Sequence, residues 1–196
     1  MADRATLKAE LEALGAATEA GFAEGGKRVE RLAELAAALE ALNPTPAPAR
    51  EADLLRGRWR LVWSSFGLKR EATLARLSFN LLPEEPVRVE ALFQEVDPES
   101  GLYDNVVDYR RPDGTAGRAV TLGRFAPASD RRMDVVFTHA QASGHPRAAI
   151  ANDRIPPLWS DVVYLDEDFR LNRGSYGSLY VLALAERAPA VWSRNA

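Results

Sequence analysis

The chain has 196 residues, of which 46% are hydrophobic and 27% charged, a composition typical of a folded globular protein. It contains no cysteine, which excludes disulfides, thiolate-ligated metals and thiol catalysis. Its 25 basic and 28 acidic residues leave a net charge of −3, and no basic cluster exceeds a pair such as Arg131-Arg132, which argues against nucleic acid as a partner.

Neither a membrane-spanning helix nor a targeting peptide is predicted. The longest uncharged stretches, Val135–Pro146 and Gly174–Ala185, are shorter than the roughly 18 apolar residues that a bilayer-spanning helix needs. Residues 1–10 lack the apolar core of a secretory signal and are too acidic for a transit peptide. We therefore expect a cytoplasmic protein.

The first 42 residues predict two amphipathic helices. In the first, from Ala5 to about Ala20, leucines recur at helical spacing until Gly25-Gly26 breaks the pattern. In the second, which stops at Asn43-Pro44, one stripe collects the apolar residues Val29, Leu32, Leu35, Leu39 and Leu42. Because short helices are unstable in isolation, we expect both stripes to cover the rest of the protein or another molecule.

A proline-rich segment at residues 43–50 marks a change in hydrophobic period from 3.6 to 2. We therefore divide the chain into a helical appendage at 1–42, a linker at 43–50 and a β domain at 51–196.

Eight strands are predicted in the β domain from the alternation of apolar and polar residues and from the turn residues between them. Their approximate ranges are 58–63, 77–81, 87–94, 102–110, 117–125, 132–138, 162–171 and 178–184. No helix-length pattern interrupts them, so we expect an antiparallel arrangement, as a sandwich or a closed barrel. We favour the barrel, which at eight strands is just wide enough for side chains or one small ligand.

Strand parity predicts an aromatic interior for this barrel. The side chains expected to face its axis are Trp59, Trp63, Phe79, Phe93, Tyr103, Tyr109, Phe137 and Tyr180. A few polar groups, such as Asn105, Ser65 or Arg170, would orient one end of a ligand. The last strand is apolar on both faces, so we expect the two N-terminal helices to cover its outer side.

Segments at both ends of the β domain resemble a known family. At the start, Asn43-Pro44 and the proline-rich spacer are followed by the stretch Leu55–Ser65, and the chain closes with Tyr164–Gly174 and Gly177–Leu182. Together these stretches resemble the opening and closing motifs of the plastid lipid-associated proteins, also called fibrillins or plastoglobulins. The resemblance spans about residues 30–184 and rests on strand pattern alone in the middle.

The resemblance implies a distant lipocalin relative, because Gly57-Arg58-Trp59 is similar to the lipocalin first-strand motif, whose tryptophan closes the barrel floor. It also implies association with hydrophobic small molecules such as prenyl lipids, quinones, carotenoids or fatty acyl chains. Plant members act in plastids and carry a transit peptide. Since no such peptide is predicted here, we expect a bacterial member and do not carry over the plastid location.

In a lipocalin-like closure, Trp59 would stack under the guanidinium of a late-strand arginine, either Arg170 or Arg173. We favour this structural role over ligand contact, and either role requires Trp59 to be buried. The predicted ligand-binding residues are Trp59, Trp63, Phe79, Phe93, Tyr109, Phe137, Arg170 and Tyr180.

The acidic run Asp166-Glu167-Asp168 is predicted to be a polar strand end that pairs with Arg170 or Arg173. A strand places only two of its three carboxylates on one face, and no second cluster of oxygen ligands is visible. We therefore do not expect a metal site there.

Both histidines, His139 and His145, lie in or beside a long loop at 140–157 that we interpret as a rim or lid of the barrel mouth. A hydrolase triad could be imitated with nearby residues, namely Asp153 or Asp161 and Ser143 or Ser160. However, no Gly-x-Ser-x-Gly elbow is present, and two imidazoles alone make a weak zinc signal. No catalytic residue, metal or cofactor is predicted.

Two functions stay open. The first is non-catalytic binding or sequestration of an apolar small molecule inside the barrel, together with peripheral contact with a membrane or lipid droplet. The second is a structural or protein-interaction module whose barrel is filled by its own side chains. The aromatic content of the interior is compatible with both.

Overall fold

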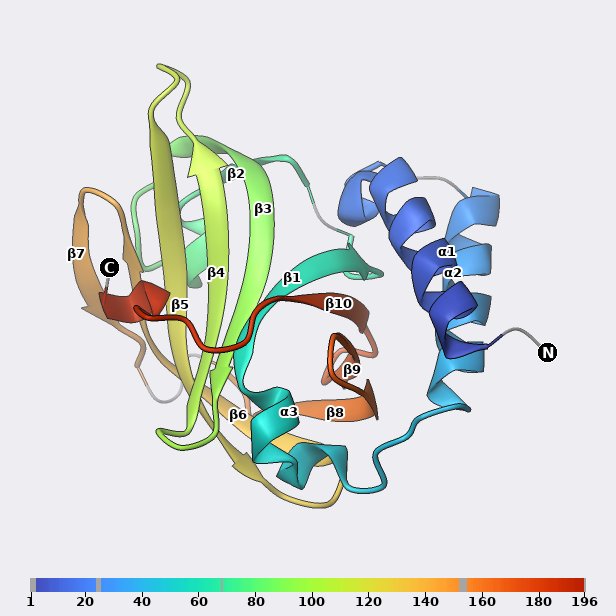
Figure 1. Ribbon diagram of the computed structural model, residues 1–196. Helices are drawn as coiled ribbons and strands as arrows, with labels where there is room; N and C mark the ends of the chain where they lie inside the picture. Colours follow the sequence, from blue (N-terminus) through green and yellow to red (C-terminus); the bar gives the residue numbers. More distant parts are fainter. Residues whose placement is uncertain (1–2, 24–25, 68, 152–154, 196) are drawn as a thin grey trace.

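A computed structural model describes residues 3–23, 26–67, 69–151 and 155–195. Eight antiparallel strands close into a barrel, because β1 pairs with β10 on one side and with β3 on the other (Figure 1). The barrel strands are β1 (Gly57–Ser64), β3 (Pro86–Asp97), β4 (Leu102–Arg110), β5 (Ala116–Pro127), β6 (Arg132–Ala142), β8 (Leu158–Leu165), β9 (Phe169–Gly174) and β10 (Leu179–Glu186). The eight-stranded antiparallel barrel expected from the sequence is confirmed.

Two short strands add to the barrel wall without being part of the closed ring. Strand β2 (Glu71–Thr73) pairs with the start of β3, and β7 (His145–Ala149) pairs with the end of β6. The segment predicted as a loop at 140–157 therefore contains the end of β6 and all of β7, and residues 152–154 of it lie outside the described residues.

The predicted strands differ from the observed ones at two places. The expected strand at 77–81 is instead a short helical turn, η3 (Arg76–Ser78), followed by Phe79 and Asn80 at positive φ, which no extended strand allows. The expected strand at 162–171 is two strands, β8 and β9, because the Asp166 side chain accepts the backbone N–H groups of Asp168 and Phe169 and reverses the chain.

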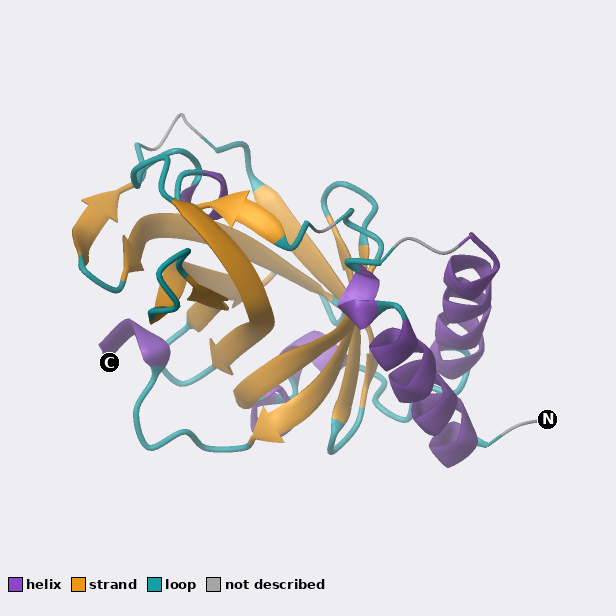
Figure 2. Cartoon of the chain, turned by 90° about the horizontal axis from the view of Figure 1, so that it is seen from above, coloured by secondary structure: helices purple, strands orange, loops and turns teal. Residues whose placement is uncertain are grey.

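Helices α1 (Arg4–Ala17) and α2 (Gly26–Glu40) lie side by side outside the barrel, as expected (Figures 1 and 2). Their buried leucines share one apolar cluster with the outward side chains of β1, β8, β9 and β10. The cluster includes Leu7, Leu11, Leu32, Leu35, Leu39, Val62, Val163, Phe169, Leu171 and Val181. No helix among the described residues has the length and apolarity that crossing a membrane would take.

The two ends of the barrel are covered differently. At one end, here called the floor, α3 (Ala52–Leu55) and the turn η2 (Pro48–Arg50) bring Leu55 and Ala49 into the cluster of inward side chains. At the other end, the segment 74–82, here called the plug, packs Leu74, Leu77 and Leu82 against inward residues of β3, β4 and β5. The Thr121 hydroxyl of β5 donates to the Leu77 carbonyl at 3.2 Å, which ties the plug to the wall.

Candidate functional site

Strand register determines which side chains face the barrel interior. Gln94 pairs with Asn105, which pairs with Thr121, and this row faces inward because Gln94 contacts the interior residue Arg170. The neighbouring row of Phe93, Val106 and Val120 therefore faces outward.

Trp59 lies at the floor and is completely buried. Its indole Nε1 donates to the Leu55 carbonyl of α3 at 2.9 Å, which joins the first barrel strand to the floor. Two guanidinium groups lie over the ring, with the Arg170 and Arg187 Cζ atoms 4.8 and 5.5 Å from its centroid. The stack of Trp59 on Arg170 expected from the sequence is present.

Arg187 completes the closure, and sequence reasoning missed it. It directly follows β10, and its guanidinium donates to the carbonyls of Asp53 at 3.0 Å and Arg56 at 2.8 Å, and also to those of Leu54 and Glu167. It thus ties the N- and C-terminal ends of the barrel sequence together at the floor. The closing sequence motif indicates only Arg170 and Arg173 as partners of Trp59, whereas Arg187 lies one residue after the apolar strand β10.

Arg170 is fully buried and only partly hydrogen-bonded. Its Nη2 donates to Gln94 Oε1 at 2.6 Å, whereas Nε and Nη1 have no partner among the described residues. Burial lowers the pKa of its guanidinium to about 10, so the group is still a cation at neutral pH. None of the ion pairs among the described residues includes Arg170.

A second polar group with unused hydrogen-bonding capacity lies two residues further along β9. Asn172 is fully buried and donates through Nδ2 to Ser160 Oγ at 2.9 Å, but its Oδ1 has no donor in the described part of the chain. Because residues two apart in a strand share a face, both groups point to the same interior region.

The other inward side chains in the half of the barrel next to the floor, here called the floor half, are apolar. The inward cluster consists of Ala49, Leu55, Trp59, Leu61, Val96, Tyr103, Met133, Val135, Val162, Leu165 and Leu182, with Leu92, Phe125, Phe137, Leu158, Tyr180 and Leu184 packed against it. An apolar wall with a few convergent polar groups is the usual composition of a small-molecule site.

The inward orientation predicted for Tyr103, Tyr109, Phe137 and Tyr180 agrees with the structure. Phe137 and Tyr103 have ring centroids 6.4 Å apart in the floor half. Tyr109 lies instead beneath the plug, where Arg111 Nη2 donates to its hydroxyl at 3.2 Å. Burial raises the pKa of the Tyr180 hydroxyl, consistent with its inward position.

Three predicted interior residues do not lie inside. Trp63 belongs to the outer cluster beneath the helices, because a bulge between Leu61 and Trp63 reverses the parity of β1. Phe93 packs outward on Val106, Val120 and Leu122, because a bulge between Val89 and Ala91 does the same to β3. Phe79 follows η3 and is 37% exposed, with its ring 5.8 Å from that of Phe137.

The acidic turn after β8 pairs with a helix and not with either predicted arginine. Lys8 of α1 lies 2.9 Å from Asp166 and also bridges to Asp168. Arg173 instead pairs with Glu40 of α2 at 2.8 Å. Arg170 faces Gln94 in the barrel interior, whereas Asp166 faces helix α1 outside it.

The histidines form no triad among the described residues. His145 Nε2 lies 2.9 Å from Glu85, three residues after the plug, and His139 Nδ1 lies 3.1 Å from the Thr138 hydroxyl. Ser143 is bonded to the backbone of Arg118, and Asp153 lies outside the described residues. No three His, Asp or Glu residues within the described part of the chain gather as a metal site would require.

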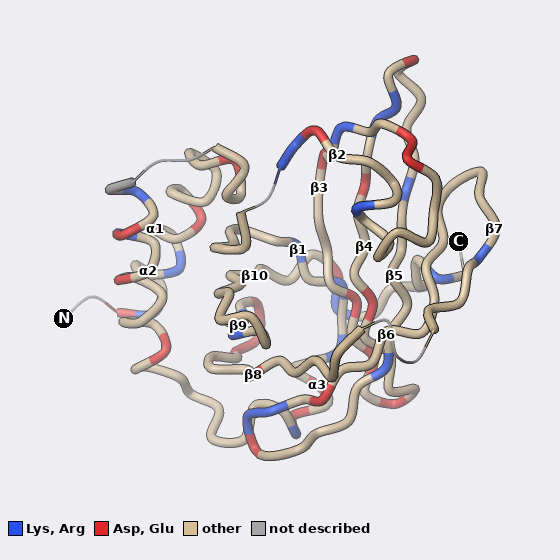
Figure 3. Tube along the Cα trace, turned by 180° about the vertical axis from the view of Figure 1, so that it is seen from behind, with Lys and Arg blue, Asp and Glu red and all other residues tan. Residues whose placement is uncertain are grey.

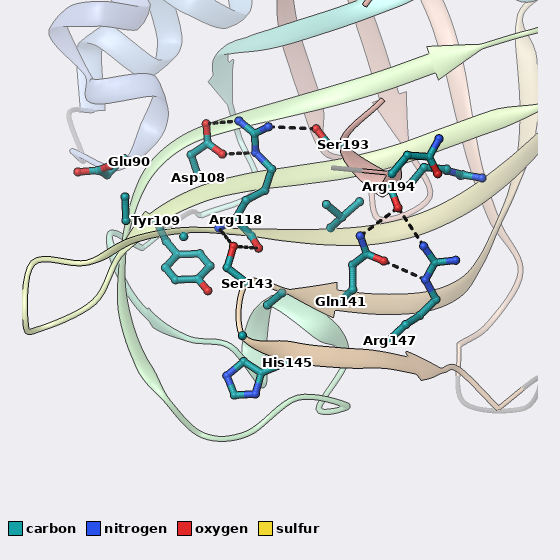
Figure 4. A pocket seen from close by; sticks show the side chains of 16 residues that line it. Glu90, Asp108, Tyr109, Arg118, Gln141, Ser143, His145, Arg147, Ser193 and Arg194 are labelled. Carbon is teal, nitrogen blue, oxygen red and sulfur yellow. Dashed lines mark hydrogen bonds and ion pairs between the residues drawn. The ribbon is translucent and has the colours of Figure 1, made fainter. Parts of the chain in front are cut away.

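A hollow of about 780 Å³ lies on the outside of the barrel, between β4–β7 and the C-terminal turn η4 (Ser193–Asn195) (Figure 4). Its walls are polar and apolar in about equal parts, and the polar groups bond to one another. Arg118 forms two bonds to Asp108, while Gln141 and Arg147 converge on the Arg194 carbonyl. The lining of this hollow is thus more polar than the inward cluster of the barrel.

The structure thus defines a closed antiparallel barrel with an apolar interior and a pair of helices outside. The chain matches the PAP_fibrillin family over residues 5–183, and it belongs to that family.

Curated relatives carry names of the same kind. The chain is 28% identical to the probable plastid-lipid-associated protein 3 of Arabidopsis thaliana, over 85% of this chain and 54% of that protein. It is 28% identical to the chromoplast-specific carotenoid-associated protein of Cucumis sativus, over 80% and 62% of the two chains. It is 27% identical to plastoglobulin-1 of Pisum sativum, over 85% and 57%. The chain thus spans little more than half the length of these relatives. No solved structure matches it significantly.

Proposed function

We propose that the protein binds an apolar small molecule inside the barrel and has no catalytic role. The observation that carries this proposal is the lining of the floor half, where aromatic and aliphatic side chains surround very few polar groups. Family membership supports it, since the relatives are named for association with plastid lipids and carotenoids.

Prenyl lipids, quinones, carotenoids and fatty acyl chains all have the apolar body that such a lining would bind. Burying that body stabilises the complex by about 25 cal/mol per Å² removed from water. Peripheral contact with a membrane or lipid droplet is compatible with this proposal. The cytoplasmic location and the bacterial origin expected from the sequence remain predictions.

The plug favours a second candidate function. Because segment 74–82 packs Leu74 and Leu82 against the inward faces of three strands, the protein itself fills part of the barrel. A barrel filled throughout would act as a structural or protein-interaction module.

An extraction distinguishes the two candidates. The protein is purified, denatured in organic solvent, and the extract analysed by mass spectrometry for lipid, quinone or carotenoid. Binding is then measured by quenching of tryptophan fluorescence with added lipids. An empty extract together with unquenched fluorescence would contradict the proposal and support the filled barrel.

A pair of matched variants tests whether binding occurs inside. Phe137 and Phe93 are both half-buried aromatic residues, but Phe137 faces inward and Phe93 outward. We expect Phe137→Gln to lower ligand retention at least tenfold, because it places an amide in the apolar lining, and Phe93→Gln to leave retention unchanged. Equal effects of the two substitutions would show that the ligand does not occupy the interior.

A further inference from the structure

Arg170 is an uncompensated cation in the barrel interior. A buried charge is costly unless it is both paired and hydrogen-bonded. Within the described ranges, two of the three guanidinium nitrogens have no partner, and the third donates only to the neutral amide of Gln94. The unpartnered Oδ1 of Asn172 places further unused hydrogen-bonding capacity on the same inner face of β9.

Closing the barrel does not explain this charge. Arg187 also covers the Trp59 ring, and it donates to four backbone carbonyls at the floor, so it performs the closure with its hydrogen bonds satisfied. Arg170 adds a positive charge on the inner side without any such set of acceptors.

The carboxylates of the neighbouring strands do not neutralise Arg170 either. Acidic and basic residues are interspersed along β3, β4 and β5 (Figure 3). The buried carboxylates of Glu95 and Asp104 lie on the outward face of these strands, where Arg58 and Arg194 pair with them at 2.6 and 2.5 Å. The positive charge of Arg170 is therefore available to a negatively charged group of a molecule that enters the barrel.

We propose that the apolar ligand carries an acidic headgroup, a carboxylate, which binds to the free N–H groups of Arg170 at the barrel floor. This inference rests on the proposed function and specifies its ligand class. A neutral carbonyl, such as that of a quinone, would accept the hydrogen bonds but leave the charge unbalanced. A phosphate, with up to two negative charges, would call for more cations than the one that the described interior provides.

The test compares oleate with methyl oleate on delipidated full-length protein. The two share one acyl chain, but the headgroup is a charged carboxylate in the first and a neutral methyl ester in the second. We expect oleate to bind ten- to a hundredfold more tightly, the range of a charge-assisted hydrogen bond to a buried group. In Arg170→Met this preference should disappear while methyl oleate still binds. The control is Arg173→Met, because Arg173 lies on the same strand but its side chain reaches Glu40 of α2.

A spectroscopic readout separates a headgroup contact from a structural role. Carbon-13 NMR of carboxyl-labelled oleate should show a bound carboxylate whose pKa lies below that of free oleate, and Arg170→Met should raise it. If methyl oleate binds as tightly as oleate, or if Arg170→Met changes thermal stability alone, the headgroup inference is wrong and the binding function stands. If neither ligand binds, the proposed function itself fails.

Discussion

Trp59 shows how much of the fold depends on one side chain. Its ring is completely buried, its indole N–H is bonded to Leu55, and two guanidinium groups pack over it. These interactions connect the first strand, the floor and the end of the last strand. Apolar burial, a hydrogen bond and cation–π contact all act at a single position.

We expect Trp59→Ala to lower the free energy of unfolding by about 3–5 kcal/mol, as large-to-small aromatic changes in a core usually do. Urea denaturation followed by circular dichroism measures the change. Phe66→Ala is the control, because Phe66 is 52% exposed and its loss should alter stability by less than about 0.5 kcal/mol. Equal effects at the two positions would mean that the floor is not a cooperative part of the fold.

At the scale of elements, α1 approaches the barrel at Gly15. A Cβ atom added there would lie 2.6 Å from the Val62 carbonyl oxygen of β1, closer than real atoms pack. Helix propensity alone would make alanine better than glycine by about 1 kcal/mol. The close approach of helix and strand should therefore reverse the usual sign of this substitution.

We expect Gly15→Ala to destabilise the protein by about 1–3 kcal/mol, the usual cost of overpacking. The reverse change at an exposed site of the same helix, Ala13→Gly, is the propensity control and should cost about 1 kcal/mol. Thermal or urea unfolding gives both values. A stabilising Gly15→Ala would show that α1 does not pack tightly on β1.

Strand bulges explain which site residues could be predicted from the sequence. Period-two alternation identified most of the strands, the barrel and the inward positions of Trp59, Tyr109 and Phe137, because their own strands alternate without interruption over 59–61, 102–110 and 133–137. It failed at Trp63 and Phe93, since one extra residue in β1 and in β3 exchanges the two faces. The alternation of residues within one strand does not reveal a bulge, because a bulge depends on how two strands pair.

The plug and Arg187 were missed for other reasons. Leu77, Phe79 and Leu81 alternate with polar residues as a strand would, and only the positive φ of Phe79 and Asn80 shows the turn. The role of Arg187 depends on the floor carbonyls that it reaches, which lie some 130 residues earlier in the chain. Local patterns carry no information on contacts of that range.

At the scale of the whole molecule, the C-terminal turn η4 fastens to buried carboxylates on the far side from the helices (Figure 2). Ser193 donates to Glu95 through its backbone N–H at 2.8 Å and its hydroxyl at 2.7 Å, and Arg194 pairs with Asp104. Burial raises the pKa of Asp104, although the bonds from Arg194 and Gly123 oppose that rise.

We expect Arg194→Ala to cost about 3–5 kcal/mol at neutral pH, because it leaves the Asp104 carboxylate buried without its cation. The folded-state pKa of Asp104 is then above its unfolded value of 3.8, so the folded state takes up a proton first as the pH falls. The deficit of the variant should therefore shrink on acidification towards pH 4. Unfolding measured against pH tests this, and Asp104→Asn combined with Arg194→Ala should recover stability.

The plug has a consequence for kinetics. With the floor sealed by Trp59 and Arg187, cargo would enter and leave past segment 74–82, which is held at Thr121 and, through Glu85, at His145. The rate of ligand exchange would then be set by how often the plug opens and not by the affinity of the ligand. Ligands with very different dissociation constants would therefore dissociate at similar rates. The barrel would store a bound ligand for a long time and would be poorly suited to rapid transfer.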